Sequence, residues 1–297
     1  MKIHQCPKCG QPAALLFRTK DYNRRLTDES FAYYRCSACQ LIFLQPIPAD
    51  LDKYYPKNYY QIPKSESELA LTAEKLQKWK LELVQQFARN GRLLEIGPAY
   101  GLFSYLAKRA GFDVTAIEMD AGCCQFLRDV VGINVIQAND AAAQLQHLER
   151  FDVIVLWQVI EHIPDPWPVL TAAAERLAPG GILVLDTPNP QAFQFRVLGR
   201  YWTHVDAPRH VELIPARLLD DYLVQAGLRP VVLTSTDWGA IGFNSFGWAF
   251  SLTNLFASAW LRALAHFSGR VLTKLLIPIE RTGWRGSTYT AVFRKDP

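Results

Sequence analysis

The stretch Leu93-Leu94-Glu95-Ile96-Gly97-Pro98-Ala99-Tyr100-Gly101 decides the fold. Its pattern is typical of a β-strand, a glycine turn and the first turn of a helix. Gly97 lets the chain turn sharply where the strand ends, and Gly101 lets the helix begin close to a ligand. Two glycines alone leave two interpretations open, a ligand-binding loop and a plain strand-to-helix turn.

From Arg92 onward, predicted strands alternate with predicted helices. The strands are Arg92–Ile96, Val114–Glu118, Asn134–Gln137, Phe151–Trp157, Gly181–Leu185 and Pro230–Thr234. The helices are Leu102–Ala110, Ala121–Val131, Pro166–Leu177 and Pro215–Ala226. This alternation is typical of an α/β protein with a doubly wound parallel sheet. We expect Thr288–Arg294 to pair beside Pro230–Thr234 as an antiparallel edge strand.

Polar residues at the ends of the later strands favour the ligand-binding interpretation. Glu118 ends the second strand of the series, where a carboxylate can accept hydrogen bonds from both hydroxyls of a ribose. Asn139-Asp140 ends the third strand, in a position that suits an adenine amino group. The three glycines that a dinucleotide pyrophosphate requires are absent, so a nucleoside without a diphosphate fits better.

Four of the six cysteines form two pairs, Cys6-x-x-Cys9 and Cys36-x-x-Cys39. Two such turns predict a tetrahedral sulfur site for a structural zinc ion. The alternatives are four unmetallated thiols or a redox pair. The long gap between the pairs predicts an inserted hairpin around Asp21–Ser30. The first residues contain no apolar run, so we expect no signal peptide, a reducing compartment and a cytoplasmic protein.

The combination resembles the class I S-adenosylmethionine-dependent methyltransferases, in the subgroup with an N-terminal zinc ribbon. Glu95–Gly101 is similar to the first motif of that family, and Glu118 to its ribose-binding acid. Phe151–Trp157 followed by Glu161-His162 is similar to a later motif, as are Leu177–Gly181 and Thr187–Asn189. The resemblance implies a Rossmann-like seven-stranded sheet, an N-terminal zinc ribbon and a helical insertion before the last strand.

The resemblance also implies S-adenosylmethionine as cofactor and a set of residues that bind it. These are Glu95, Gly97, Pro98, Ala99, Tyr100, Gly101, Glu118, Met119, Asn139, Asp140, Trp157 and Gln158. Ala99 departs from the family, which has glycine at this position. Tyr60, Tyr100 and Trp157 are candidates for an aromatic face beside the sulfonium, although each also suits ordinary packing.

A histidine is the side chain best suited to act as a base near neutral pH. Four histidines are expected near the mouth of the site, and we favour His210, then His204, over His147 and His162. We expect His162 to play a structural part. Some related quinol O-methyltransferases bind a divalent metal through Glu-His and an acid three residues earlier. Gln158 stands at that earlier position here, which argues against a metal at Glu161 and His162.

The resemblance divides the chain into four parts. These are a zinc ribbon (1–50), a connector and helix (51–90), the S-adenosylmethionine-binding methyltransferase domain (91–237 and 287–297) and a helical insertion (238–286). The insertion is rich in aromatic residues and carries Arg262, Arg270 and Lys274. It is either a lid that packs on the domain or an interfacial helix pair that meets a lipid-linked substrate or the inner face of a membrane.

Three functions stay open at this level. The first is methyl transfer from S-adenosylmethionine to an oxygen or carbon of a small molecule or saccharide, with a lipid-linked acceptor as a variant. The second is RNA base methylation, because residues 1–64 hold ten Lys/Arg and five Asp/Glu. An Asn/Asp-Pro-Pro-aromatic loop that would hold the base amine is absent. The third is a non-catalytic cofactor-binding module.

Overall fold

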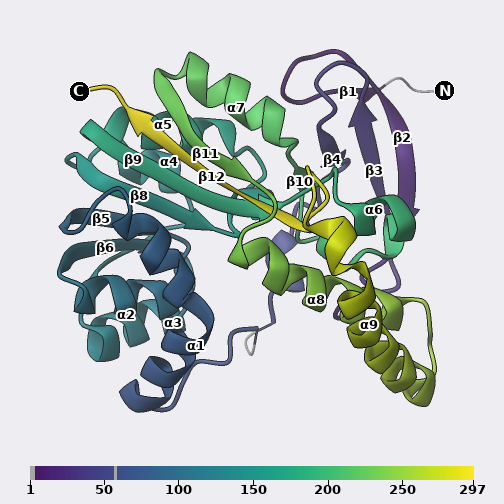
Figure 1. Ribbon diagram of the computed structural model, residues 1–297. Coiled ribbons are helices and arrows are strands. Elements are labelled where there is room, and N and C mark those ends of the chain that lie inside the picture. The colour runs from purple at the N-terminus through teal and green to yellow at the C-terminus, as the bar shows by residue number, and fades with distance from the viewer. Residues whose placement is uncertain (1–3, 57–58) are drawn as a thin grey trace.

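The computed structural model describes residues 4–56 and 59–297 and contains two sheets (Figure 1). Residues 1–3, in the segment where we expect no signal peptide, and residues 57–58 of the tyrosine-rich connector lie outside this description. The larger sheet has seven strands in the order β11-β12-β9-β8-β5-β6-β7. Its pairs β8–β9, β5–β8, β5–β6 and β6–β7 are parallel, whereas β12 runs antiparallel to both neighbours.

The elements of the α/β part follow one another along the chain as the sequence predicts. The strands of the large sheet are β5 (Gly91–Ile96), β6 (Phe112–Glu118), β7 (Asn134–Gln137), β8 (Phe151–Trp157), β9 (Leu177–Pro188), β11 (Leu228–Thr234) and β12 (Thr288–Lys295). The helices are α1 (Glu66–Gln85), α2 (Leu102–Arg109), α3 (Ala121–Phe126), α4 (Ala141–Leu145), α5 (Trp167–Arg176), α6 (Phe193–Leu198), α7 (Ala216–Gln225), α8 (Trp238–Asn254) and α9 (Ala259–Glu280).

The expectation that the last strand lies at the edge of the sheet is wrong. β12 lies between β9 and β11, and β11 forms the edge. The reason is that residues 288–293 of β12 are buried and carry no charge, as a strand between two neighbours requires. β11, in contrast, has exposed residues at Arg229–Val231, which suits an edge.

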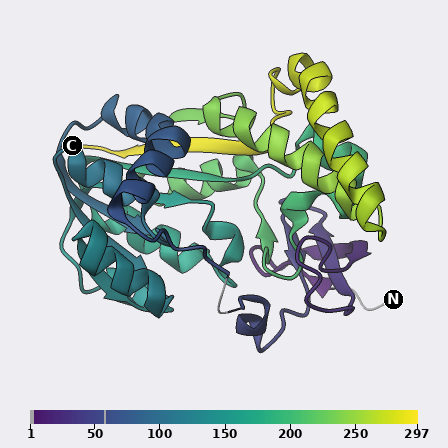
Figure 2. The ribbon, with the colours of Figure 1, turned by 90° about the horizontal axis from the view of Figure 1, so that it is seen from below.

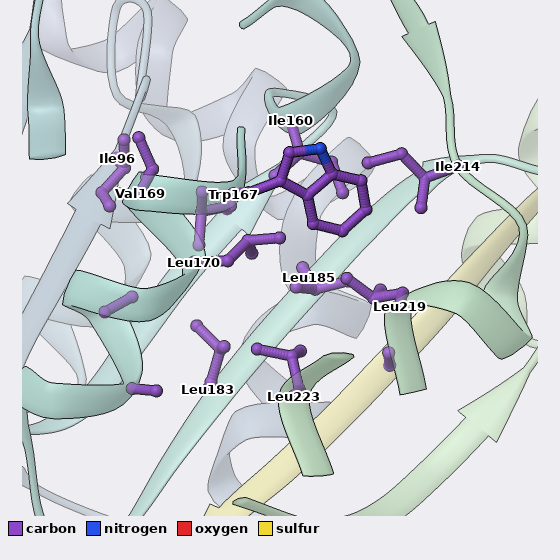
Figure 3. Packing of buried hydrophobic residues seen from close by; sticks show 14 of the residues in the cluster. Ile96, Ile160, Trp167, Val169, Leu170, Leu183, Leu185, Ile214, Leu219 and Leu223 are labelled. Carbon is purple, nitrogen blue, oxygen red and sulfur yellow. The ribbon is translucent and has the colours of Figure 1, made fainter. Parts of the chain in front are cut away.

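Apolar helices cover both faces of the large sheet. On one face, Leu170 of α5 and Leu219 and Leu223 of α7 pack against Leu183 and Leu185 of β9 (Figure 3). On the other face, α1, α2 and α3 contribute side chains to two further clusters. Each fully buried leucine contributes about 1.5–3 kcal/mol relative to exposure, so these two layers hold the strand ends of the site in place.

The helix predicted over Ala121–Val131 changes its winding partway. α3 ends at Phe126, and Leu127–Val131 continues as a wider π-helical turn that stops at Gly132, where φ is +69°. A Cβ on Gly101 would lie 2.4 Å from Leu127 Cδ2. The absence of a side chain at Gly101 therefore lets α2 start close to this turn.

The smaller sheet has the order β1-β2-β3-β4-β10. Its strands are β1 (His4–Gln5), β2 (Pro12–Thr19), β3 (Phe31–Cys36), β4 (Ile42–Leu44) and β10 (Glu212–Leu213). The predicted inserted hairpin around Asp21–Ser30 is instead the loop of the β2–β3 hairpin, because Thr19 already pairs with Phe31. β10 comes from the C-terminal half of the chain and pairs with β4, so the two parts share a sheet.

The segment before the last strand forms an antiparallel helix pair, α8 and α9, which projects from one side of the molecule (Figure 2). Polar groups anchor α8 to the rest of the chain. Asn244 Oδ1 accepts from the Ser287 amide at 2.7 Å, and Gln194 Nε2 donates to the Asn244 carbonyl at 2.8 Å. Among the described residues, no helix is both long and apolar enough to cross a membrane.

Candidate functional site

The loop between β5 and α2 bends through left-handed backbone conformations. φ is +68° at Gly97, +52° at Ala99 and +83° at Gly101. Glycine adopts this conformation freely, whereas alanine at position 99 does so at a cost of about 1 kcal/mol. The loop therefore keeps its bent shape despite the substitution. It lies at the carboxyl end of β5, beside the end of β6.

Glu118, at the end of β6, is buried and tied to this loop. Its Oε2 accepts from the Ala99 amide at 3.0 Å, and its Oε1 accepts from the amides of Met119 and Asp120 at 2.8 and 2.9 Å. Burial raises the pKa of Glu118, and these amides act in the opposite direction. A carboxylate has about four acceptor positions, so Oε2 keeps one for a ligand hydroxyl. The residue fits the predicted ribose contact.

The other predicted cofactor residues lie around the same strand ends, in different surroundings. Met119, Asn139 and Asp140 are exposed, and Asp140 also caps α4 by accepting from the Ala143 amide. Tyr100 is half-buried. Trp157 is 7% exposed and packs edge-on against Phe103, inside a core cluster. Its ring therefore packs in the core beneath the carboxyl end of β8.

A buried group of charges lies beneath the loop and was missed in the sequence. Lys80 of α1 is 6% exposed, and its ammonium lies 4.7 Å from the centre of the Trp157 ring, near Glu95 and Asp186. Burial lowers the pKa of Lys80 and raises those of both carboxyls. The signal was present, because Lys80 stands seven residues after Ala73 and four before Val84, on the buried side of α1.

Gln158 joins this buried group to the end of β8. Its Nε2 donates to Asp186 Oδ1 at 2.9 Å, and its own backbone is left-handed, with φ of +57°. Ser104 Oγ donates to Glu95 Oε2 at 2.5 Å. Glu95 and Gln158 therefore hold the two neighbouring strand ends that flank the cofactor loop.

Glu161, His162 and His210 meet at the carboxyl end of β8. One ligand atom from each of the three lies within 4.8 Å of the others. The rings of His162 and His210 cross edge to face with 4.5 Å between their centres, and Thr187 Oγ1 donates to Glu161 Oε2 at 2.9 Å. The 47 residues between His162 and His210 give no sign in the sequence that the two side chains meet.

The hydrogen bonds of His210 fix its tautomer. Nδ1 lies 2.8 Å from the His204 carbonyl oxygen, which can only accept, so Nδ1 carries the proton and Nε2 keeps a lone pair. Burial lowers the pKa of His210 to about 3 and that of His162 to about 4. Both rings are neutral at physiological pH. Burial raises the pKa of Glu161 to about 8, so this carboxyl carries a proton there.

The other two candidate histidines lie elsewhere. The His204 ring is 4% exposed, packs against Trp202 and Phe243, and its Nε2 has no hydrogen-bond partner among the described residues. His147 is exposed in the turn after α4. Of the four, only His162 and His210 belong to the described cluster. The Tyr55 hydroxyl lies 2.9 Å from His162 Nδ1 and adds the connector to this group.

A buried ion network holds the segment that carries His210. Arg209 is fully buried, and its Nη2 donates at 2.7 Å to both Asp21 Oδ1 and Asp206 Oδ1. Burial alone would raise the pKa of Asp206, but the hydrogen bonds from Arg209 hold it well below its usual range. Asp21 belongs to the β2–β3 loop. The N-terminal sheet therefore helps to position the histidine cluster.

The four paired cysteines converge at one end of the small sheet. The Sγ atoms are 3.6 Å apart for Cys6 and Cys39, 3.5 Å for Cys9 and Cys36, and 3.7 Å for Cys9 and Cys39. Tetrahedral Zn–S bonds of about 2.3 Å place the sulfurs about 3.8 Å from one another. The thiols are free, and their arrangement fits a zinc ion. Cys123 and Cys124 are buried separately in α3.

Comparison with known proteins agrees with this geometry. The family model Methyltransf_23, described as a methyltransferase domain, matches residues 69–233. The ubiquinone biosynthesis O-methyltransferase of Cereibacter sphaeroides is 33% identical over 173 residues, which cover 55% of this chain and 68% of that protein. The enzyme of the same name from Ruegeria pomeroyi is 31% identical over 173 residues, with the same coverage.

Solved structures share the fold. A SAM-dependent methyltransferase from Archaeoglobus fulgidus covers 75% of this chain and 94% of its own, with a TM-score of 0.52 and 18% identity. Coclaurine N-methyltransferase covers 84% of this chain and 83% of its own, with a TM-score of 0.53 and 13% identity. The chain therefore belongs to the class I S-adenosylmethionine-dependent methyltransferases.

Proposed function

We propose that this enzyme transfers a methyl group to a hydroxyl oxygen of a small molecule and that His210 is the general base. The observation that carries the proposal is the fixed tautomer of His210, which leaves a lone pair on Nε2 in a side chain that clusters with Glu161 and His162 at the end of β8. The relatives named as ubiquinone biosynthesis O-methyltransferases support an oxygen as the methyl acceptor.

For this reaction the protein has to align the acceptor oxygen with the methyl carbon, exclude water and accept one proton. S-Adenosylmethionine supplies the methyl group as a sulfonium. On the protein side, Glu118 and the loop at Gly97–Gly101 are the residues that would hold the nucleoside. His210 Nε2 would take the proton that the acceptor hydroxyl loses as its oxygen bonds to the methyl carbon and the C–S bond breaks. A buried neutral imidazole can accept this proton without first losing one of its own.

We further propose that the four cysteines bind one structural zinc ion. Their spacing fits a closed tetrahedral site with four sulfur ligands, which leaves no position for a substrate. The metal would stabilise the small sheet, and the ion network of Arg209 would connect that sheet to the methyl-transfer site.

The test starts from the ligand that co-purifies with the enzyme, identified by mass spectrometry, followed by a panel of phenols, saccharides and lipid-linked saccharides. With an accepted substrate, His210→Ala should lower kcat by about 10²–10⁴ while the affinity for S-adenosylmethionine, measured by calorimetry, stays unchanged. His147→Ala, at an exposed histidine outside the cluster, is the matched control. Full turnover by His210→Ala would reject His210 as the base.

The pH profile separates a base from a residue that only packs. Because the His210 pKa is lowered, the free enzyme carries the competent neutral form at neutral pH and loses it only in acid. Titration of His210 should therefore lower the rate of the wild type only below about pH 3, so the rate of the folded enzyme should not decline between pH 7 and pH 4. In His210→Ala, the residual rate should rise with the concentration of hydroxide. A residual rate that ignores pH would contradict the assignment.

A further inference from the structure

The outward face of α9 carries a continuous stripe of large apolar side chains. Trp260, Leu264, Phe267, Val271 and Leu275 follow one another at spacings of four, three, four and four residues. Their exposed fractions are 68%, 56%, 66%, 45% and 67%. Residues at these spacings lie on one side of a helix. An exposed apolar stripe of this length marks an interaction surface.

The inward face of α9 is made of small residues, which reverses the usual arrangement of a surface helix. Ala265, Gly269 and Thr273 are buried against α8. A Cβ on Gly269 would lie 2.5 Å from Ala249 Cα, so the two helix backbones nearly touch. The side of α9 with small residues thus packs against α8, and the side with large apolar residues stays exposed.

Basic residues border the stripe, and acids are missing from it. Arg270 and Lys274 are exposed on the helix beside the stripe, and Arg281 follows at its end. Between residues 238 and 286 the only acid is Glu280. That carboxylate is buried and accepts from Trp248 Nε1 at 2.8 Å and Gln194 Nε2 at 2.9 Å. The exposed surface of this segment is therefore apolar and positively charged.

We propose that the outer face of α9 docks on the surface of an anionic lipid bilayer. Aromatic and aliphatic side chains would enter the boundary between headgroups and acyl chains, and Arg270 and Lys274 would contact lipid phosphates. Trp260, near the start of the helix, has the amphipathic ring that favours this boundary. The charge pattern selects a negatively charged membrane over a neutral one. The proposal stands independently of which acceptor is methylated.

The test is flotation of the full-length protein with vesicles of phosphatidylcholine and phosphatidylglycerol, against vesicles of phosphatidylcholine alone. The wild type should float with the anionic vesicles and remain unbound with the neutral ones, and salt should weaken its binding. Phe267→Asp combined with Leu275→Asp should reduce binding about tenfold or more. Leu71→Asp, at the 76% exposed leucine of α1, is the matched control and should bind like the wild type.

A second pair of variants tests the charges. Arg270→Glu with Lys274→Glu should reduce binding to anionic vesicles about tenfold or more, whereas Lys75→Glu with Lys78→Glu, on the exposed side of α1, should not. Titration of every variant with S-adenosylmethionine shows, independently of vesicle binding, whether the variant is folded and its methyl-transfer site is intact. Equal binding of wild type and stripe variants would overturn the proposal. The proposal would also be overturned if the wild type were a dimer that does not bind vesicles and the stripe variants were monomers. In that case the outer face of α9 would bind a second copy of the chain.

Discussion

Replacing Arg209 should destabilise the protein far more than replacing an arginine at the surface. The guanidinium is fully buried and bonds both Asp21 and Asp206, with contacts of 2.7 Å to each from Nη2 and 2.9 Å from Nε to Asp206 Oδ2. Arg209→Met would leave two carboxylates in the interior without their counterion. Breaking a buried pair by removing one partner costs about 3–5 kcal/mol, so we expect a loss of about 4 kcal/mol in the free energy of unfolding.

The assay is urea unfolding followed by tryptophan fluorescence. With a slope of about 3 kcal/mol per molar urea, the midpoint should fall by about 1.3 M. The triple variant Asp21→Asn, Asp206→Asn, Arg209→Met should recover most of the loss, because it no longer buries an unpaired charge. Arg217→Met, which removes an exposed pair with 3.9 Å between Arg217 Nε and Asp221 Oδ2, should change stability by less than about 0.5 kcal/mol.

Two results would refute this reasoning. The first is a loss below about 1 kcal/mol in Arg209→Met, which would mean that water already solvates the carboxylates. The second is a triple variant no more stable than the single one, which would assign the effect to packing of the arginine stem and not to its charge.

Three further predictions concern the cofactor, the metal and the pH dependence. Glu118→Ala should weaken S-adenosylmethionine binding at least about tenfold in calorimetry, because the ribose loses its acceptor; unchanged affinity would remove Glu118 from the site. Metal analysis should find one zinc per chain in the wild type and none in Cys36→Ser; a metal-free protein that is stably folded would disprove the zinc site. Burial, with a smaller contribution from Asp165, raises the pKa of Glu212 to about 8. Its stabilising contribution is complete below the unfolded pKa of about 4.3 and disappears as the pH rises through 8. In urea unfolding, the stability of the wild type relative to Glu212→Gln should therefore fall by up to about 1.4 kcal/mol per pH unit. A difference in stability that stays constant from pH 6 to 8 would contradict this.

Most of the α/β part could be predicted from the sequence, because each element there has a strong local pattern. Phe151–Trp157 is apolar except for Asp152, and the structure has a strand with the same bounds. Ser65-x-x-Glu68 is likewise a local capping pattern, and in the structure the Ser65 side chain accepts from the Glu68 amide at the start of α1. The predicted position of β12 was wrong because the sequence pattern along one strand does not reveal how many neighbouring strands it has.

The site was less predictable, because it depends on contacts between distant segments. The strand-end residues follow from topology, which brings the carboxyl ends of β5, β6 and β8 to one edge. The meeting of His162 with His210, and of Asp21 with Arg209, depends on how the loop after β9 folds back on the N-terminal sheet. No periodicity encodes that path. Lys80 is the exception, since its place on the apolar stripe of α1 was visible.

The pairing of β4 with β10 makes the N-terminal sheet inseparable from the remainder of the chain. Residues 212–213 complete that sheet, and Cys6, Tyr34 and Phe43 share a core cluster with Ile214 and Tyr289. Removal of the first fifty residues would leave β10 unpaired and expose the apolar surface that they cover. Transfer of these residues to another catalytic domain would leave their sheet without its outermost strand. A recombination experiment that treats this region as a portable cassette must therefore transfer the segment around β10 with it.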